Sequence, residues 1–108
     1  MIKNLLNRGK TILIAEACDN HFGKLDNAKQ MVIAAKKAGA DVIKFQHHLP
    51  DEEMLKEVPK SKNFTISLYD FLKKYSLKIQ HHKILKDFCK KIKSNICAHH
   101  LALKQLKN

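Results

Sequence analysis

TILIAEACDNHFGKLDNAKQMVIAAKKAGADVIKFQ, residues 11–46, is the stretch that decides the fold. Its two ends, residues 11–17 and 41–46, are short apolar runs typical of strands buried on both faces of a parallel sheet. Between them, apolar residues recur at helical spacing over residues 25–38, Asp26 suits the first turn, and Gly39 suits the position after the last turn. The pattern predicts a strand, a helix and a second, parallel strand joined by a right-handed crossover.

The chain beyond residue 46 indicates helices joined to this unit by a long connection. Residues 47–67 contain Pro50 and Pro59 and at most one helical turn, at residues 51–56, and long connections of this kind are often functional. Residues 68–75 predict a helix. Residues 79–92 predict another, which is expected to bury Ile79, Leu85, Phe88 and Ile92.

The length and charge of the chain limit what it can be. At 108 residues and 44% hydrophobic content, one core is the most to expect. The net charge of +11 first suggests a polyanion partner, but all but one of the 21 basic residues are lysines, scattered along the chain, and the exception is Arg8. A lysine-rich solvated surface without a nucleic-acid partner is expected. A free-standing basic α/β module that binds polyanions stays open as an alternative.

Targeting, metal and disulfide signals are weak. The first ten residues lack the apolar core of a signal peptide, and no later run approaches the roughly 20 apolar residues of a membrane span, so a cytoplasmic protein without membrane contact is expected. Three cysteines without C-x-x-C spacing predict reduced thiols. Six of the seven histidines form adjacent pairs, and adjacent side chains point in different directions, so no metal site within the chain is predicted.

Four polar residues fall at or just beyond the ends of the two predicted strands: Glu16, Asn20, Lys44 and Gln46. In α/β folds, ligands bind at this edge of the sheet. Glu16 and Lys44 interrupt apolar strands, and such charges must be paired unless they face a wet pocket. The residues alone leave two interpretations open, a catalytic role or a structural ion pair between neighbouring strands.

Four ordered blocks carry a resemblance to a known family: ILIAEACDNHFG, AKQMVIAAKKAGADVIKFQ, NFTISLYDFLKK and HKILKDFCKKI. Together they span roughly residues 10–93 and resemble the N-terminal part of the N-acetylneuraminate synthase family, including legionaminate-type synthases. The resemblance implies a (β/α)8 barrel that needs a divalent metal, Mn or Mg, and works as a homodimer. It also implies a reaction between phosphoenolpyruvate and an N-acetylated hexosamine. The enol carbon attacks the aldehyde, water adds at the oxocarbenium carbon, and phosphate leaves as a nine-carbon ulosonic acid forms.

The resemblance also implies roles for individual residues. Glu16 matches the family's strand-end acid, which contacts metal-bound water or the sugar aldehyde, and Lys44 with Gln46 matches the KFQ motif, which contacts phosphoenolpyruvate. Asn63 matches a loop asparagine that contacts the amino sugar. The Asn20–His21 pair matches the conventional pair of the first loop. The chain departs from the common pattern at residues 17–19, which leaves the substrate's identity open.

What the chain lacks relative to the family leads to two further expectations. A (β/α)8 barrel needs about 250 residues, and the family's two metal-binding histidines lie beyond the matched part, so residues 1–94 are interpreted as a truncated N-terminal part of the barrel, inactive alone. Residues 95–108 show neither a clean strand period nor a turn signal, and their lysine-studded leucine pattern suggests a frayed helix. Two origins of this tail are open, a divergent natural C-terminus and a change of reading frame. Shifting the reading frame permits the family's Cys-Thr-Pro-Phe signature, and His99 can then give only Pro or Ser. An out-of-frame tail is therefore predicted.

Overall fold

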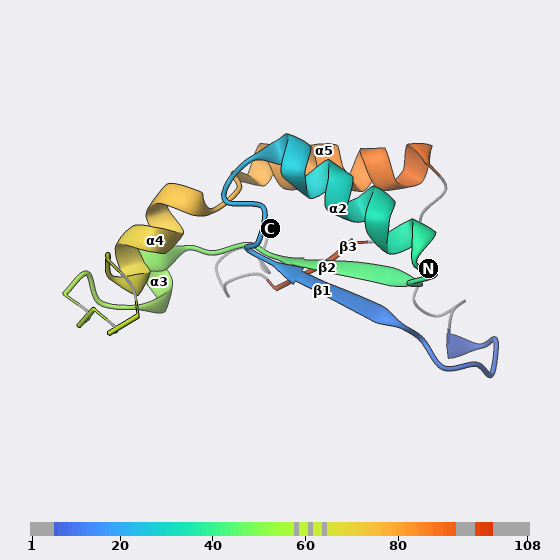
Figure 1. Cartoon of the computed structure of the whole chain (residues 1–108), viewed down its shortest axis with the longest axis horizontal. Coiled ribbons are helices and arrows are strands. Elements are labelled where there is room, and N and C mark those ends of the chain that lie inside the picture. Colours follow the sequence, from blue (N-terminus) through green and yellow to red (C-terminus); the bar gives the residue numbers. More distant parts are fainter. Residues whose placement is uncertain (1–5, 58, 61, 64, 93–96, 101–108) are drawn as a thin grey trace.

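The computed structural model describes residues 6–57, 59–60, 62–63, 65–92 and 97–100, the last four by their backbone only. Three parallel strands form one sheet in the order β1-β2-β3. Helices α2 and α5 lie side by side over one face of this sheet, and α3 and α4 lie beyond the carboxyl ends of the strands (Figure 1). The elements are β1 Ile14–Cys18, α2 Leu25–Lys37, β2 Val42–Gln46, α3 Pro50–Glu53, α4 Leu68–Tyr75, α5 Ile79–Lys91 and β3 Cys97–His100.

The core lies between the sheet and the two covering helices. Successive strand residues point to opposite faces, so Ile43 and Phe45 of β2 turn toward the helices, and Phe45 is fully buried. The rest of the core comprises Ala17, Ala28, Val32, Leu77, Leu85 and Cys89. Burying a side chain of phenylalanine size contributes roughly 1.5–3 kcal/mol, so this layer holds the strands in place beneath the helices.

The predicted βαβ unit is confirmed, with small shifts at its ends. β1 and β2 pair in parallel, and α2 joins them, ending at Lys37, with Gly39 just beyond at a φ of +87°. β1 begins three residues later than predicted because the backbone N–H of Leu13 donates to the carboxylate of Asp41, at 3.0 Å, instead of to a neighbouring strand. The same carboxylate pairs with Arg8 at 2.8 Å.

Helix α4 has the predicted bounds, and α3 is shorter than its prediction, a single turn at Pro50–Glu53. The hydroxyl of Ser67 accepts a hydrogen bond from the backbone N–H of Asp70, which caps the first turn of α4. Asp51 joins the two helices, since its carboxylate accepts from the Tyr69 hydroxyl and pairs with Lys73 at 2.8 Å. These contacts fix α3, which lies in the connection between β2 and α4, against α4.

The predicted buried face of α5 is wrong at its first residue. Ile79 is 37% exposed, and the buried stripe consists of His82, Leu85 and Cys89, spaced three and four residues apart. His82 belongs to this stripe, and its ring packs edge-on against the ring of His47, with the ring centres 4.8 Å apart. The buried face of α5 therefore includes a polar ring that contacts another ring.

Strand β3 corrects the expectation for the tail. Residues 97–100 pair in parallel with β2, from Ile43 opposite Cys97 to Gln46 opposite His100, where no strand was expected. Four residues that include two histidines show no alternation of apolar and polar side chains. Strand β3 is therefore recognised only from its pairing with the backbone of β2. Residues 95–96 and 101–108 lie outside the described residues, so the out-of-frame tail stays a prediction.

Candidate functional site

The sequence-predicted residues Glu16 and Lys44 meet at the carboxyl edge of the sheet. They are partners in the parallel register of β1 and β2, and the Nζ atom of Lys44 lies 3.1 Å from Oε1 of Glu16. Both side chains lie on the face away from α2 and α5, because their neighbours Ala17 and Ile43 point into the core.

This ion pair is open to solvent. The side chains of Lys44 and Glu16 are 36% and 51% exposed. An exposed pair of this kind contributes roughly 0–1 kcal/mol to stability, so folding gains little from placing charges in these two strands. The ion pair between neighbouring strands thus forms, and a ligand can still reach both groups, so the choice between a structural and a catalytic role stays open.

The end of β1 is distorted next to this pair. The register shifts between Glu16 and Cys18, and Cys18 has a φ of +51°, in the left-handed region. The Cys18 thiol donates to Oε2 of Glu16 at 3.8 Å. Burial and the charges of Glu16 and Asp19 raise the pKa of the Cys18 thiol, which favours the neutral thiol over the nucleophilic thiolate.

The loop after β1 holds the predicted Asn20–His21 pair in two different environments. His21 is fully buried, and its Nδ1 accepts from the backbone N–H of Gly23 at 2.9 Å, so a neutral ring carries its proton on Nε2. Burial lowers the pKa of His21 and keeps it neutral. Its ring lies near that of Phe45, with the centres 6.0 Å apart, so His21 anchors the loop to the core.

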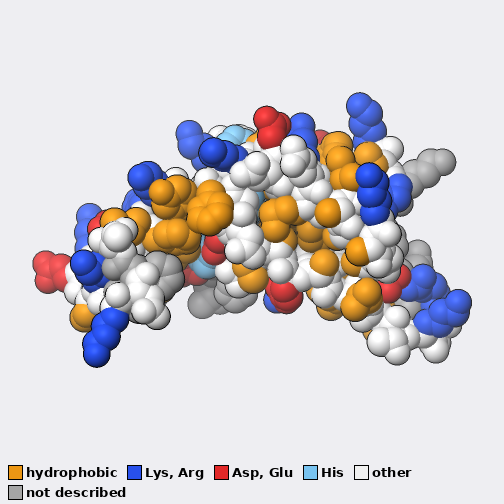
Figure 2. All heavy atoms as spheres, in the orientation of Figure 1, with side chains coloured by type: hydrophobic (Ala, Val, Ile, Leu, Met, Phe, Trp, Pro, Cys, Tyr) orange, Lys and Arg blue, Asp and Glu red, His pale blue; other side chains and the backbone are white. Residues whose placement is uncertain are grey.

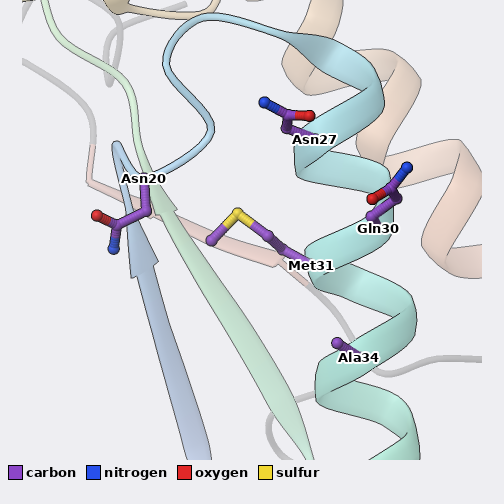
Figure 3. Close-up of a pocket in the computed structure, with 5 residues that line it drawn as sticks. All are labelled: Asn20, Asn27, Gln30, Met31 and Ala34. Carbon is purple, nitrogen blue, oxygen red and sulfur yellow. The ribbon is translucent and has the colours of Figure 1, made fainter.

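Asn20 is exposed and borders a hollow beside α2. The hollow has a volume of about 400 Å³ and is lined by Asn20, Asn27, Gln30, Met31 and Ala34. Met31 reaches from α2 toward the strands, with Asn20 just beyond the end of β1 and with Asn27 and Gln30 on α2 (Figure 3). Asn20 therefore lies near the helix side of β1, whereas Glu16 and Lys44 lie on the other face of the sheet.

Gly23 allows the same loop to pack against α4. Its φ is +73°, and a Cβ atom at this position would lie 3.1 Å from the carbonyl oxygen of Tyr75. The neighbouring Phe22 packs edge-on against the rings of Phe71 and Tyr75. Only glycine fits here without strain, because the contact is with backbone atoms, which cannot turn aside as a side chain can.

The remaining two predicted residues differ in position. Gln46 is the last residue of β2, on the same face as Lys44, and so belongs to the strand-end group. Asn63 lies in an exposed turn of the connection between α3 and α4, and not on a strand end. The structure thus gathers Glu16, Lys44 and Gln46, buries His21, and leaves Asn20 and Asn63 at separate places.

Sequence reasoning missed a polar cluster around His48, just after β2. Nε2 of His48 lies 2.9 Å from Oδ2 of Asp19 and 3.1 Å from Oε1 of Gln46. Nδ1 of the same ring lies 3.2 Å from Oε2 of Glu53. The only signal in the sequence was a histidine just beyond a strand end with acidic residues in the loops on either side.

The described residues do not supply the metal site that the resemblance implies. Among them, no group of three or more His, Cys, Asp or Glu side chains is placed to hold a metal ion. At the strand ends, Glu16 is engaged with Lys44, and both carboxylates beside His48 are engaged with its ring. No chemical step is therefore assigned to a metal held by these residues.

A family assignment follows from comparison with known proteins. The model of the NeuB family matches residues 31–107, which make up more than half of the chain. This chain belongs to the NeuB family. The resemblance to the synthase family is confirmed, and the match includes strand β2, with Lys44 and Gln46, and the described part of β3.

Relatives within the NeuB family include two synthases of bacterial sugar acids. Pseudaminic acid synthase of Campylobacter jejuni is 40% identical over 76 residues, which are 70% of this chain and 22% of the relative. The N,N'-diacetyllegionaminic acid synthase of Legionella pneumophila is 37% identical over 95 residues, which cover 80% of this chain and 27% of the relative. The chain thus spans about a quarter of the length of these relatives.

A solved structure has the same arrangement of elements. The spore coat polysaccharide biosynthesis protein SpsE of Bacillus subtilis superposes with a TM-score of 0.60 at 31% identity, and the match covers 87% of this chain and 24% of SpsE. The mixed α/β fold with parallel strands is therefore shared within the family. In the part of the chain that the structure describes, no helix is long and apolar enough to cross a membrane.

Proposed function

We propose that this NeuB-family chain forms the N-terminal part of a (β/α)8 barrel whose complete form is a synthase. That synthase condenses phosphoenolpyruvate with the open-chain aldehyde of an N-acetylated hexosamine and produces a nine-carbon sugar acid. Membership of the family and the two synthase relatives support the class of reaction. The parallel βαβ unit, with its helices on one face of the sheet, supports the barrel.

The observation that carries the proposal is the grouping of Glu16, Lys44 and Gln46. All three lie at the carboxyl edge of parallel strands, on the face away from the covering helices. In a closed barrel this face lines the interior, and its carboxyl edge is where (β/α)8 enzymes bind their substrates. If these positions only filled the interior of the barrel, apolar side chains would be expected there. Instead they carry a carboxylate, an ammonium and a carboxamide.

Each group has a definite chemical capacity in this proposal. The ammonium of Lys44 has three N–H donors, of which the contact with Glu16 uses one, so it can also bind a phosphate or carboxylate oxygen of phosphoenolpyruvate. The carboxamide of Gln46 can donate to the same anion. Glu16, which is half exposed, can accept a proton or a hydrogen bond from the sugar aldehyde's hydrate or from water.

Other parts of the proposal concern the complete enzyme. It is a cytoplasmic homodimer that uses a divalent cation, Mn²⁺ or Mg²⁺. Asn20 and Asn63 contribute to sugar binding from their loops, and the buried His21 holds the first of these loops in place. The described residues do not form the cation site, so nothing in the roles of Glu16, Lys44 and Gln46 depends on it. The chain alone is inactive in this proposal because it holds too few ligands.

Binding of phosphoenolpyruvate by the purified 108-residue chain tests the proposal. In ¹⁵N-labelled protein, we expect millimolar phosphoenolpyruvate to shift the backbone signals of Lys44 and the side-chain amide of Gln46. Lys44→Ala should abolish the shifts, and Lys37→Ala, which removes an exposed lysine from α2, should leave them unchanged. Signals at both residues that stay in place up to saturating ligand would contradict the assignment.

The same samples separate this function from the polyanion module. Affinity for heparin or duplex DNA that falls steeply with added salt, through counterion release, would favour the basic module. We expect instead that lysines spread over the surface give only weak binding. This weak binding of heparin or DNA should decline in proportion to the number of lysines removed. Removal of Lys44 should have no greater effect than removal of any other exposed lysine.

A further inference from the structure

His48 is held between two carboxylates from different elements. Its Nε2 faces Oδ2 of Asp19, on the loop after β1, at 2.9 Å, and its Nδ1 faces Oε2 and Oε1 of Glu53, on α3, at 3.2 and 3.3 Å. A carboxylate oxygen accepts hydrogen bonds, so each ring nitrogen must donate one. Only the doubly protonated imidazolium form of His48 satisfies both contacts.

The charge of this ring determines how Gln46 is oriented. The same Nε2 of His48 lies 3.1 Å from the carboxamide of Gln46. Because Nε2 carries a proton, the Gln46 atom that faces it must be the acceptor, Oε1. The NH₂ group of Gln46 is on the opposite side of the carboxamide and therefore points away from the His48 ring.

The surroundings favour the positive ring. The side chains of His48, Asp19 and Glu53 are only 12%, 18% and 21% exposed, so the contacts are screened less than those of a surface ion pair. The hydrogen bond that His48 donates to Asp19, and then the other contacts with Asp19 and Glu53, raise the pKa of His48 against the effect of burial.

The other groups around the ring fit the same charge state. Glu53 is itself fixed by the backbone N–H of Leu49, which donates to its Oε2 at 3.0 Å. His21 lies on the same loop as Asp19. Burial lowers the pKa of His21 against the effect of Asp19, and His48 lowers it further, so His21 is neutral. Two carboxylates thus face one imidazolium, and the buried His21 adds no positive charge.

We propose that His48 is a positioning residue: its imidazolium joins Asp19 to Glu53 and holds the carboxamide oxygen of Gln46, so that Gln46 presents an N–H donor to an anionic ligand at the carboxyl edge. We call Asp19, His48 and Glu53 the imidazolium clamp. The identity of this ligand as phosphoenolpyruvate rests on the proposed function. The clamp and its contact with Gln46 do not depend on that function.

The clamp makes the orientation of Gln46 depend on pH. The pKa of His48 is raised in the folded chain, so the clamp is complete below pH 6.5, the ordinary value, and is lost as the pH rises through the folded pKa. Once Nε2 loses its proton, it becomes an acceptor and can no longer donate to Oε1 of Gln46. The carboxamide is then free to turn over.

An NMR titration of the ¹⁵N-labelled full chain tests the clamp directly. We expect both ring nitrogens of His48 to be protonated at low pH, with a midpoint above 6.5, and the side-chain NH₂ signals of Gln46 to move with the same midpoint. Asp19→Asn should lower the midpoint. Asp87→Asn, the same change at an exposed position on α5, should leave it in place.

Variants at His48 then test the effect on a ligand at a single pH, because the phosphate of phosphoenolpyruvate titrates in the same range. His48→Gln should weaken phosphoenolpyruvate binding by roughly twofold to tenfold, the fold-change worth one neutral hydrogen bond. His81→Gln, on α5, is the matched control and should bind as the original chain does. If His48→Gln fails to fold, the titration and Asp19→Asn decide the question.

The outcomes separate the two proposals. Gln46 signals that ignore the titration of His48, or a midpoint that Asp19→Asn leaves unchanged, would overturn the clamp. A clamp that titrates as expected in a chain whose Gln46 signals do not respond to phosphoenolpyruvate would support the clamp and overturn the proposed function. Equal loss of binding in His48→Gln and His81→Gln would point to general destabilisation and overturn the positioning role.

Discussion

Replacing Gly23 by alanine tests how the β1 loop is seated on α4. Two costs add at this position. An alanine at the observed φ of +73° enters the left-handed region, which costs about 1–2 kcal/mol for a residue with a Cβ atom. The new Cβ would also lie 3.1–3.2 Å from three backbone atoms of Tyr75, and relieving such overpacking costs about 1–3 kcal/mol. We expect Gly23→Ala to lower the free energy of unfolding by about 2–5 kcal/mol.

Gly39 provides a matched control for this estimate. It also has a positive φ, +87°, but a Cβ atom there would meet nothing within 4 Å. Gly39→Ala should therefore cost only the conformational part, about 1–2 kcal/mol. The difference between the two variants isolates the contact between the loop and Tyr75.

Urea denaturation followed by circular dichroism measures both variants on the same scale. The midpoint should fall further for Gly23→Ala than for Gly39→Ala, and a chemical-shift change at Tyr75 should accompany only the first. Equal losses in the two variants would refute the reasoning, because the close approach to α4 would then contribute nothing to stability.

Three further outcomes are expected. Below pH 3.8 the chain should lose stability as the pH falls through the folded pKa of Asp41, which is lowered by the hydrogen bond from Leu13 and then by Arg8, and thermal unfolding of Asp41→Asn should show a weaker dependence over that range. Lys44→Ala should change the free energy of unfolding by no more than about 1 kcal/mol, since its ion pair is exposed, and a larger loss in urea would mean that the pair is structural. The isolated chain should release no phosphate from phosphoenolpyruvate with Mn²⁺ or Mg²⁺ and N-acetylated hexosamines, and turnover that follows the purified chain would contradict its proposed inactivity.

The sequence predicts the local elements well because their signals are local. The helix over Leu68–Tyr75 has the predicted bounds, since a serine cap and a clear periodicity lie within a few residues of each other. The βαβ unit follows from two apolar runs and one amphipathic segment. Its first strand begins late because of Asp41, which is 28 residues away from Leu13 and leaves no trace in the pattern around residue 13.

The remaining features depend on contacts between distant residues. β3 forms through pairing with β2, and its own four residues carry no strand pattern. The face of α5 is decided by the ring contact between His47 and His82. At the site, Glu16 and Lys44 could be placed together from strand order alone, whereas the contact between Asp19 and His48 spans 29 residues and three elements meet there, so only the folded chain reveals it.

The open side of β1 has a consequence for handling the chain in solution. Among the described residues, β1 pairs with β2 alone, so its other edge keeps backbone N–H and C=O groups available to another strand. Ile14 at the start of this strand and Leu13 just before it are 51% and 56% exposed, and hydrophobic side chains gather between α2 and β1 on the visible face (Figure 2). Such an edge is a template for intermolecular pairing. Light scattering at increasing concentration should therefore show self-association, and spectroscopic work on the isolated chain requires dilute samples or a charged substitution at Ile14.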